Sequence, residues 1–274
     1  MAKASDLVRP GRQQLVRLEV LRSERISPHF QRVTVGGGSI DRFTPMGWDQ
    51  WFRMFIPTAG ETGLDQLPDK VNLLGYLRYL RIDKGERPVL RNYTVRAFRP
   101  VGLNGPELDI DFVLHGSAED GTAGPASTWA QTCRPGDPIG IVDEGIAFNP
   151  GRGTDHVLLL ADETGVPAVA GVLASLPDTA TGTAILEVPS DEDRFDLPHP
   201  PGVEVRWLSR SSGQQAGDLA LPALVAVTPE PAVHAFLVGE QSLVQGARRH
   251  LVSAGVPKDR ISFVGYWRNG ASGQ

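Results

Sequence analysis

The sequence predicts two folded parts in series: a six-stranded antiparallel Greek-key β-barrel, followed by a parallel-sheet α/β domain. Short strands separated by turn residues fill the first half, a pattern typical of a small antiparallel barrel. In the second half, continuous apolar runs alternate with helical segments, as in a parallel sheet with right-handed crossovers. The pattern changes near Asn149-Pro-Gly-Arg-Gly153, so we expect domains of residues 1–150 and 151–274.

The elements of the first half follow from alternation and turn residues. Residues 58–90 are polar and rich in turn residues, with an apolar island at 71–80, which predicts an insertion that carries a short helix. A helix is also predicted at 125–133, opened by Gly124 and Pro125. The six strands are expected at 14–26, 30–35, 51–56, 91–96, 107–115 and 137–142.

The second half reads as alternating strands and helices. Helices are predicted at 166–176 and 242–254, and the short apolar stretch 222–227 also favours a helix. There is no Gly-x-Gly-x-x-Gly fingerprint, so a nucleotide bound here would be held without the usual glycine signature. The buried strands are expected at 157–161, 183–188, 203–208, 235–238 and 261–266.

Composition excludes several classes of protein. The chain has 274 residues and a net charge of −5, which disfavours a nucleic-acid-binding surface. Its single cysteine, Cys133, allows no internal disulfide and no cysteine metal cluster, and it fits a reducing compartment. No apolar run is long enough to cross a bilayer, and no secretory signal is recognisable. We therefore expect a cytoplasmic protein with no membrane partner and no metal site of its own.

Two segments point to a bound dinucleotide. In Arg91-Asn-Tyr93-Thr-Val95-Arg, alternation places Arg91, Tyr93 and Val95 on one face. An arginine beside an aromatic ring suits a ligand with a phosphate and a flat ring. The helix that Gly124 opens has free N–H groups that attract an anion. Taken singly, each segment also fits a plain strand or an ordinary helix start. Their order and spacing favour a site for FAD.

Six segments in order resemble the siderophore-interacting proteins, a branch of the ferredoxin–NADP reductase superfamily. The resemblance implies an FAD-binding barrel, an α/β domain that binds NADPH or NADH as electron donor, and ferric-siderophore reductase activity. The segments are Arg91-Asn-Tyr-Thr-Val-Arg96, Phe112-Val-Leu-His115, Gly124-Pro-Ala-Ser-Thr-Trp-Ala130, Ala161-Asp-Glu-Thr164, Gly239-Glu240 and Gly265-Tyr-Trp-Arg-Asn-Gly270.

The resemblance assigns roles around FAD. Arg91 would pair with the pyrophosphate, Tyr93 would pack on the isoalloxazine or ribityl group, and Thr94 would form a hydrogen bond near flavin N5. Thr94 is the one catalytic candidate. An ideal strand turns Thr94 away from Tyr93, so its main chain or a distortion must bring it to the ring. Further cofactor contacts are implied at Arg96, His115, Gly124, Ala126 and Ser127, although a histidine at a strand end can also have a purely local partner.

The resemblance also assigns residues to the donor and the substrate. Asp162, Thr164 and Glu240 would lie where ligands of open α/β sheets bind, but Asp162 and Thr164 fit helix capping equally well. In the wider superfamily a Ser-Arg pair takes the 2′-phosphate of NADPH, so Ser209-Arg210 favours NADPH over NADH, with a solvated turn as the alternative. Basic residues that would hold the ferric siderophore are Arg53 and Arg268.

The implied mechanism is hydride transfer from NADPH to flavin N5, followed by single-electron transfer to the ferric iron of a siderophore. Two alternatives stay open: a general flavin or ferredoxin-type reductase of the same superfamily, and a nucleotide-binding module with no redox role. The sequence leaves open the siderophore class, the choice between NADPH, NADH and ferredoxin, and the role of the 58–90 insertion. We expect a monomer, although the sequence contains no direct signal of oligomeric state.

Overall fold

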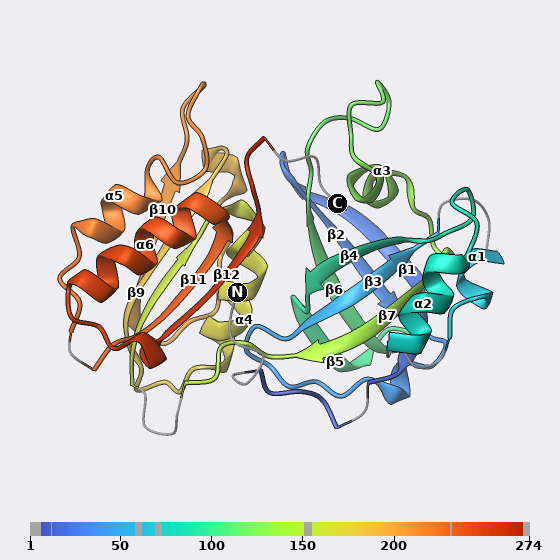
Figure 1. Ribbon diagram of the computed structural model, residues 1–274, viewed down its shortest axis with the longest axis horizontal. Helices are drawn as coiled ribbons and strands as arrows, with labels where there is room; N and C mark the ends of the chain where they lie inside the picture. Colours follow the sequence, from blue (N-terminus) through green and yellow to red (C-terminus); the bar gives the residue numbers. More distant parts are fainter. Residues whose placement is uncertain are drawn as a thin grey trace. The chain divides into compact units, whose positions relative to one another are not determined.

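The computed structural model describes residues 7–11, 13–57, 62–68, 73–150, 155–230 and 232–270. The chain divides into two compact units (Figure 1). The barrel unit comprises Arg9–Met46 and Gln50–Ile146. The α/β unit comprises the chain from Ala147 onward, the short segment Gly47–Asp49 and the N-terminal residues up to Val8.

The barrel unit is built on one antiparallel sheet of seven strands in the order β4-β3-β7-β1-β2-β6-β5. The predicted antiparallel barrel is therefore confirmed, and six of its strands are those expected from the sequence. The seventh, β5, was not predicted because it contains Pro100, which the position of β5 at one end of the strand order tolerates. The strands are β1 (Leu15–Ser27), β2 (Phe30–Gly36), β3 (Trp51–Ile56), β4 (Val89–Thr94), β5 (Ala97–Gly102), β6 (Gly105–Val113) and β7 (Pro138–Gly145).

The barrel is closed by two residues between β4 and β5. These strands lie at opposite ends of the order but are consecutive in the chain. The Val95 N–H donates to the Gln50 carbonyl at 2.8 Å, beside β3, and the Arg96 N–H donates to the Asp109 carbonyl at 2.9 Å, on β6. The chain thus passes from the β3 side to the β6 side at this point. Tyr93 and Thr94 lie immediately before the crossing.

The insertion after β3 contains α1 (Thr62–Asp65) and α2 (Leu73–Arg81). The predicted short helix is confirmed from Leu73 onward, and the first residues of the apolar island lie outside the described residues. The Tyr79 ring lies 5.7 Å from that of Phe55 on β3, and its hydroxyl donates to the Pro88 carbonyl at 3.0 Å. The insertion builds a second small core against β1, β3 and β7, formed by Leu15, Phe55, Leu64, Leu67, Tyr79, Ile82 and Val142.

Two further helices complete the barrel unit. The 3₁₀ helix η1 (Ile40–Arg42) follows β2, and α3 (Pro125–Thr132) lies between β6 and β7. Ala130 of α3 is fully buried in the main barrel core, and Trp129 packs against that core. This packing fixes the start of α3 relative to the strands that carry the candidate site.

The α/β unit has a five-stranded parallel sheet in the order β10-β9-β8-β11-β12, as predicted. Figure 1 shows α5 and α6 on one face of the sheet and α4 on the other. The strands are β8 (His156–Ala161), β9 (Thr181–Val188), β10 (Gly202–Ser209), β11 (His234–Glu240) and β12 (Ile261–Trp267). The helices are α4 (Val166–Ser175), α5 (Ala220–Val225) and α6 (Gln241–Ser253), with 3₁₀ turns η2 (Glu163–Gly165), η3 (Asp191–Asp193) and η4 (Lys258–Arg260).

The order of these strands creates a topological switch point. The chain leaves β8 toward β9 on one side and returns to the other side of β8 with β11. In open α/β sheets, ligands bind beyond the carboxyl ends of the strands at such a point. The residues that follow β8 and β11 are therefore the expected position of a ligand site in this unit. No helix among the described residues is long and apolar enough to cross a membrane.

The segment Gly47–Asp49 comes from the barrel half of the sequence but packs within the α/β unit. Trp48 has a φ of 54°, which is rare for a bulky residue. Its N–H donates to Ser175 Oγ at 2.7 Å, and its ring lies 5.8 Å from that of Phe148. The buried Asp49 carboxylate accepts the N–H groups of Ala147 at 3.1 Å and Phe148 at 2.9 Å, and burial raises its pKa to about 6.

The raised pKa of Asp49 predicts a pH-dependent stability that Asp49→Asn removes. The unfolded pKa of an aspartate is about 3.9, so between about pH 4 and 6 the folded state binds the extra proton. The free energy of unfolding of the wild type should therefore fall relative to Asp49→Asn as pH rises through this window, by at most about 3 kcal/mol. Urea unfolding of both proteins at pH 4 and pH 7 measures this, and parallel pH profiles would contradict it.

Candidate functional site

Every second residue of β4 lies on the face of the strand that is turned to the barrel core, as the predicted alternation requires. Arg91 is paired with Met54 of β3, and Tyr93 is paired with Phe52. Phe52 and Met54 are fully buried in the barrel core, and Val95 joins the same cluster. Because directly opposed residues of an antiparallel pair share a face, Arg91, Tyr93 and Val95 lie on one side of the strand.

Arg91 is half-buried, and its guanidinium has donors available for an anion. Nη1 donates to the carbonyl of the neighbouring Leu90 at 2.8 Å. Within the part of the chain that the structure describes, no carboxylate forms an ion pair with Arg91. An arginine that keeps its charge and most of its five N–H donors suits a phosphate ligand.

An aromatic row connects β4, β6 and α3. The Tyr93 ring lies 4.3 Å from the Phe112 ring, and the Phe112 ring lies 5.6 Å from the Trp129 ring. Tyr93 is half-buried, and this burial raises the pKa of its phenol above the ordinary value. The phenol therefore stays neutral, and Tyr93 offers both a flat ring and an O–H donor.

The start of α3 has no side-chain cap. Gly124 occupies the N-cap position, and the Thr128 N–H already donates to the Gly124 carbonyl at 2.8 Å. Pro125 has no N–H, so Ala126 and Ser127 carry the first-turn N–H groups that an α-helix leaves without an internal partner. Such groups, aligned with the helix dipole, form a site for an anion.

Ser127 and His115 are connected at this helix start. The buried Ser127 hydroxyl donates to the carbonyl of His115 at 3.4 Å, so the Ser127 side chain faces the protein while its N–H stays at the first turn. The His115 side chain is exposed just after β6. A contact of His115 with the adenosine or ribityl group of FAD remains a prediction.

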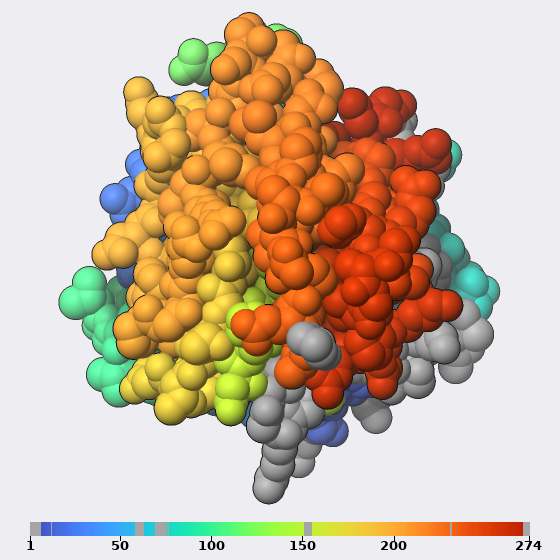
Figure 2. All heavy atoms as spheres, turned by 90° about the vertical axis from the view of Figure 1, so that its left-hand side faces the viewer, coloured from blue at the N-terminus to red at the C-terminus, as the bar shows by residue number. Residues whose placement is uncertain are grey.

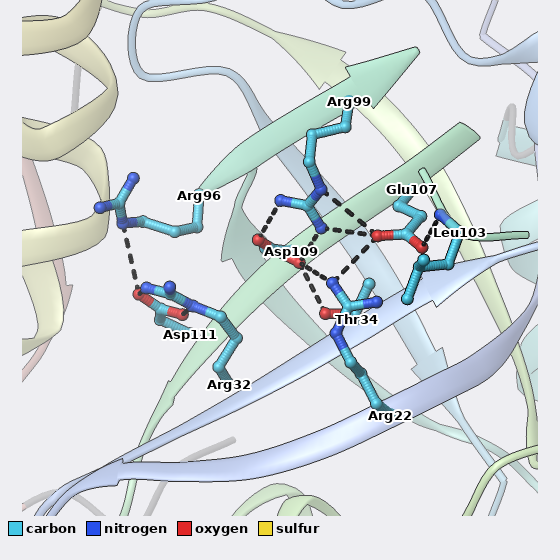
Figure 3. A network of polar contacts seen from close by, with 9 residues as sticks. All are labelled: Arg22, Arg32, Thr34, Arg96, Arg99, Leu103, Glu107, Asp109 and Asp111. Atoms are coloured by element: carbon cyan, nitrogen blue, oxygen red, sulfur yellow. Dashed lines mark hydrogen bonds and ion pairs between the residues drawn. The ribbon is translucent and has the colours of Figure 1, made fainter. Parts of the chain in front are cut away.

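Thr94 and Arg96 lie on either side of the barrel crossing. Thr94 is buried, with 8% of its surface exposed, and is paired with Trp51. Arg96 Nε lies 3.4 Å from Asp111 Oδ2, and burial lowers the pKa of its guanidinium. Figure 3 shows Asp111 between the guanidinium groups of Arg32 and Arg96. The Arg96 guanidinium is therefore partly paired with Asp111. Its contact with FAD stays a prediction.

Arg96 belongs to a network of arginines and β6 carboxylates (Figure 3). Arg99 on β5 contacts Asp109 at 2.6 and 2.7 Å, and Arg32 on β2 contacts Asp111 at 2.7 and 2.8 Å. Bidentate pairs of this kind are geometrically specific. The network also includes Arg22, Thr34 and Glu107. It fastens β5 to β6 and so fixes the end of the crossing that positions Thr94.

The two substrate candidates have different surroundings. Arg53 on β3 has its Nε 2.9 Å from Glu144 Oε1, and a third of its side chain is exposed. Glu144 also accepts from Gln13 at 3.3 Å. Arg268 is exposed directly after β12, in the α/β unit. Arg53 is thus a partly neutralised cation, whereas Arg268 is open to solvent.

In the α/β unit, Asp162 connects the carboxyl ends of three strands. Its carboxylate accepts the Thr164 N–H at 2.9 Å, the Glu240 N–H at 2.6 Å and the Trp267 Nε1–H at 2.9 Å. These partners follow β8, end β11 and end β12. Burial, and then the neighbouring Glu163, raise the pKa of Asp162 to about 6. The helix-capping alternative for Asp162 is thus observed, in that it caps η2 through Thr164.

Glu240 is likewise a cap. Its carboxylate accepts N–H groups at the start of α6, including that of Leu243 at 3.2 Å, and the Asn269 N–H at 3.2 Å. Burial would raise its pKa, but the hydrogen bonds from Ser242 and Asn269 hold that pKa below the ordinary value. Gly239 has a φ of 127°, and a Cβ there would lie 2.6 Å from the Asp162 carboxyl carbon, so only glycine fits.

Ser209 and Arg210, predicted to act as a pair, contact different residues in the structure. The Arg210 guanidinium lies between two buried carboxylates, with Nη2 2.8 Å from Glu163 Oε1 and Nη1 3.1 Å from Glu187 Oε1. The Ser209 hydroxyl instead accepts N–H bonds from the exposed Arg194, at 3.1 and 3.2 Å. The two neighbours therefore have different surroundings, and their shared role on a 2′-phosphate stays a prediction that the observed contacts disfavour for Arg210.

Comparison with known proteins places the chain in a family. Residues 19–148 match the model of the siderophore-interacting FAD-binding domain, and residues 154–270 match that of the siderophore-interacting protein. The chain belongs to the siderophore-interacting protein family. It is 31% identical over 260 residues to the ferric vibriobactin reductase ViuB of Vibrio cholerae, covering 92% of this chain and 89% of that protein. The fold and the family implied by the sequence are thus confirmed.

Two further relatives cover nearly the whole chain. The NADPH-dependent ferric-chelate reductase of Escherichia coli is 29% identical over 254 residues, covering 91% of each chain. The solved structure of a siderophore utilization protein from T. fusca matches with a TM-score of 0.78 at 32% identity, covering 97% of each chain. These proteins are similar to this chain along both units.

The barrel unit of this family member fits FAD on its own geometry. An uncapped helix start, an arginine with free donors and a half-buried aromatic ring offer an anion site and a flat apolar surface. Tyr93 and α3 are connected through Phe112 and Trp129. These features would hold the pyrophosphate and the ring of FAD, as the family's domain name implies.

Three residues that organise the α/β edge were missed from the sequence. Glu187 is a fully buried acid at the apolar end of β9, and this unusual position was a usable signal. Trp267 lies in the quoted Gly-Tyr-Trp-Arg segment, but its bond to Asp162 depends on the fold. Arg194 follows the acidic residues 191–193, and only the structure brings it to Ser209.

Proposed function

We propose that this protein is an NAD(P)H-dependent flavoprotein reductase that reduces ferric siderophores and releases ferrous iron. The observation that carries the proposal is that Arg91 and Tyr93 lie on β4, a strand that contacts α3, whose start is uncapped. The relatives of this family member include named ferric reductases. Bound FAD would supply the step from hydride acceptance to single-electron transfer. The single cysteine fits a reducing compartment, so we place the reaction in the cytoplasm. We take the protein to act as a monomer.

In the barrel unit, the chain's own residues bind and orient the flavin. Arg91 and the N–H groups of Ala126 and Ser127 hold the pyrophosphate, and Tyr93 packs on the ring system. Gly124 leaves the helix start uncapped for this purpose. Thr94, held next to the barrel crossing, is the candidate hydrogen-bond partner of flavin N5. Burial of Thr94 and the network on β6 restrict its position.

In the α/β unit, the carboxyl edge of the sheet receives the nicotinamide donor. Asp162 holds the ends of β8, β11 and β12 together, so the edge is preformed. Thr164 and Glu240 lie on the same edge as candidate donor contacts. Their positions at the switch point match where dinucleotides bind in open α/β sheets.

Cationic side chains would draw in the ferric chelate. Arg53 in the barrel unit is partly exposed, and Arg268 in the α/β unit is exposed. Attraction of an anionic chelate by exposed cations raises its local concentration and weakens with added salt. The iron is reduced while the siderophore holds it, and ferrous iron then leaves the weaker complex.

Acceptor specificity tests the proposal. With NADPH as donor, ferric siderophores should be reduced faster than a ferredoxin or free FMN, and the rate at low chelate concentration should fall as salt is raised. Initial rates for each acceptor at two ionic strengths measure both effects. Faster turnover with ferredoxin or FMN would favour the general reductase, and a colourless protein with no turnover would favour a non-redox nucleotide-binding module.

A further inference from the structure

Arg210 is not free to bind a phosphate. Only 10% of its side chain is exposed, and its guanidinium is held by the buried carboxylates of Glu163 and Glu187. Two carboxylates against one guanidinium leave this buried cluster without spare positive charge. A phosphate arriving here would have to displace a buried carboxylate and leave it unpaired, which is strongly unfavourable.

Glu187 also cannot turn away to release Arg210. Its Oε1 accepts the Gly217 N–H at 2.9 Å, and its Oε2 accepts the N–H groups of Leu219 at 3.1 Å and Ala220 at 2.7 Å. Rotation of the Glu187 side chain would leave these amides unsatisfied. The ion pair of Arg210 is therefore part of the framework that fixes the segment before α5.

The exposed Arg194 lies where Arg210 was expected to act. It follows η3 in the connection from β9 to β10, and its Nε and Nη2 contact Ser209 Oγ at 3.2 and 3.1 Å. Ser209, the last residue of β10, pairs with Val188, the last residue of β9. Arg194 and Ser209 thus meet at the carboxyl edge of two adjacent parallel strands. In Figure 1 and Figure 2 the orange segment that follows β10 rises beside this edge, at the top of the view.

The donor chemistry at this pair suits a phosphate. Ser209 Oγ accepts N–H bonds from Arg194, which leaves its own O–H available as a donor. Arg194 has 45% of its side chain exposed and keeps further N–H groups. Its counter-ion, Asp191, is 75% exposed and is therefore easily displaced.

An acidic residue, Asp191, lies at the same edge and would oppose the binding of a phosphate. In dinucleotide-binding folds, an acid near the end of the second strand accepts the ribose 2′-hydroxyl of NADH, whereas an arginine there accommodates the 2′-phosphate of NADPH. Asp191 and Arg194 both follow β9, the second strand of this sheet in chain order. Asp191 would repel a phosphate, while Arg194 with Ser209 would bind one.

We propose that Arg194, acting with the Ser209 hydroxyl, is the residue that selects NADPH through its 2′-phosphate, and that Asp191 limits this selection. The inference rests on the proposed nicotinamide-dependent function and names the donor-specificity residue of that same site. Arg210 then has a positioning role inside the protein.

Binding of two nucleotide fragments to the full-length protein tests the assignment without turnover. Calorimetry should show that Arg194→Ala weakens binding of 2′,5′-ADP by about 10- to 100-fold, as expected for loss of a charged hydrogen-bonding pair, and leaves 5′-AMP binding unchanged. Asp191→Asn should strengthen 2′,5′-ADP binding. The matched control is Arg206→Ala, because Arg206 on β10 is equally exposed and ion-paired with Glu204.

Steady-state kinetics separates this inference from the proposed function. Arg194→Ala should lower kcat/KM for NADPH while kcat/KM for NADH stays within about twofold. Equal losses for both donors, equal losses for both fragments, or an effect as large in Arg206→Ala would overturn the role of Arg194. If the fragment results hold but neither donor supports reduction of a ferric siderophore, the phosphate site stands and the proposed reductase function fails.

Discussion

Replacing Arg91 with alanine is expected to weaken FAD binding by about 10- to 100-fold, because charged hydrogen bonds to a phosphate contribute about 1.5–3 kcal/mol. Within the described residues Arg91 has no carboxylate partner, so its removal leaves no buried charge behind and the barrel unit should stay folded. Titration of FAD into the cofactor-free protein, followed by flavin fluorescence, measures the change.

Two variants make this result interpretable. Arg91→Lys keeps the charge but loses the planar pair of donors, so its affinity should be intermediate. Arg42→Ala removes an exposed arginine from η1 of the same unit and should bind FAD as the wild type does. Wild-type affinity in Arg91→Ala would show that the pyrophosphate is held elsewhere.

Replacing Arg210 with alanine should destabilise the α/β unit by about 3–5 kcal/mol, because it leaves two buried carboxylates without their cation. Glu163 and Glu187 are 3% and 0% exposed, and Glu163 Oε2 already lacks a hydrogen-bond partner among the described residues. Urea unfolding followed by tryptophan fluorescence measures the loss.

The accompanying control also removes the acid that has an unpaired oxygen. Arg210→Met combined with Glu163→Gln leaves only the Glu187 carboxylate, which keeps its three backbone N–H donors, so the double variant should recover part of the lost stability. If Arg210→Ala keeps wild-type stability and instead loses discrimination for NADPH, then the Ser209-Arg210 pair acts on the 2′-phosphate as the sequence suggested.

Both units could be predicted from the pattern of apolar and polar residues, because that pattern depends on neighbouring residues alone. Alternation in residues 107–115 and the apolar run 157–161 identify a barrel strand and a buried parallel strand from neighbouring residues alone. The exception is β5, where Pro100 and a register shift between Arg99 and Gly102 break the alternation. Its pairing with β6 is secured by the Arg99 ion pairs, whose partners lie further along the chain.

The candidate site was predictable in its position but not in its pairings. Arg91 and Tyr93 share a face because strand geometry requires it. Which arginine is neutralised is set by distant residues: Glu163 and Glu187 hold Arg210, whereas Arg194 reaches Ser209. A motif that names adjacent residues cannot reveal these long-range partners.

The contribution of Gly47–Asp49 to the α/β unit is also beyond sequence patterning. Asp49 accepts its bonds from the backbone N–H groups of Ala147 and Phe148. Backbone donors carry no side-chain signature, so a contact across nearly a hundred residues leaves no mark in the sequence. The buried carboxylate became recognisable only when the fold brought these segments together.

The central claim is that the Arg91–Tyr93 strand and the start of α3 hold a redox-active FAD. Its most direct test is the anaerobic absorbance spectrum of the purified protein, recorded before and after NADPH and again after a ferric siderophore. The account predicts an oxidised-flavin spectrum that NADPH bleaches and the ferric siderophore restores, with ferrous iron formed in proportion. A protein that shows no flavin absorbance even after incubation with FAD would contradict it.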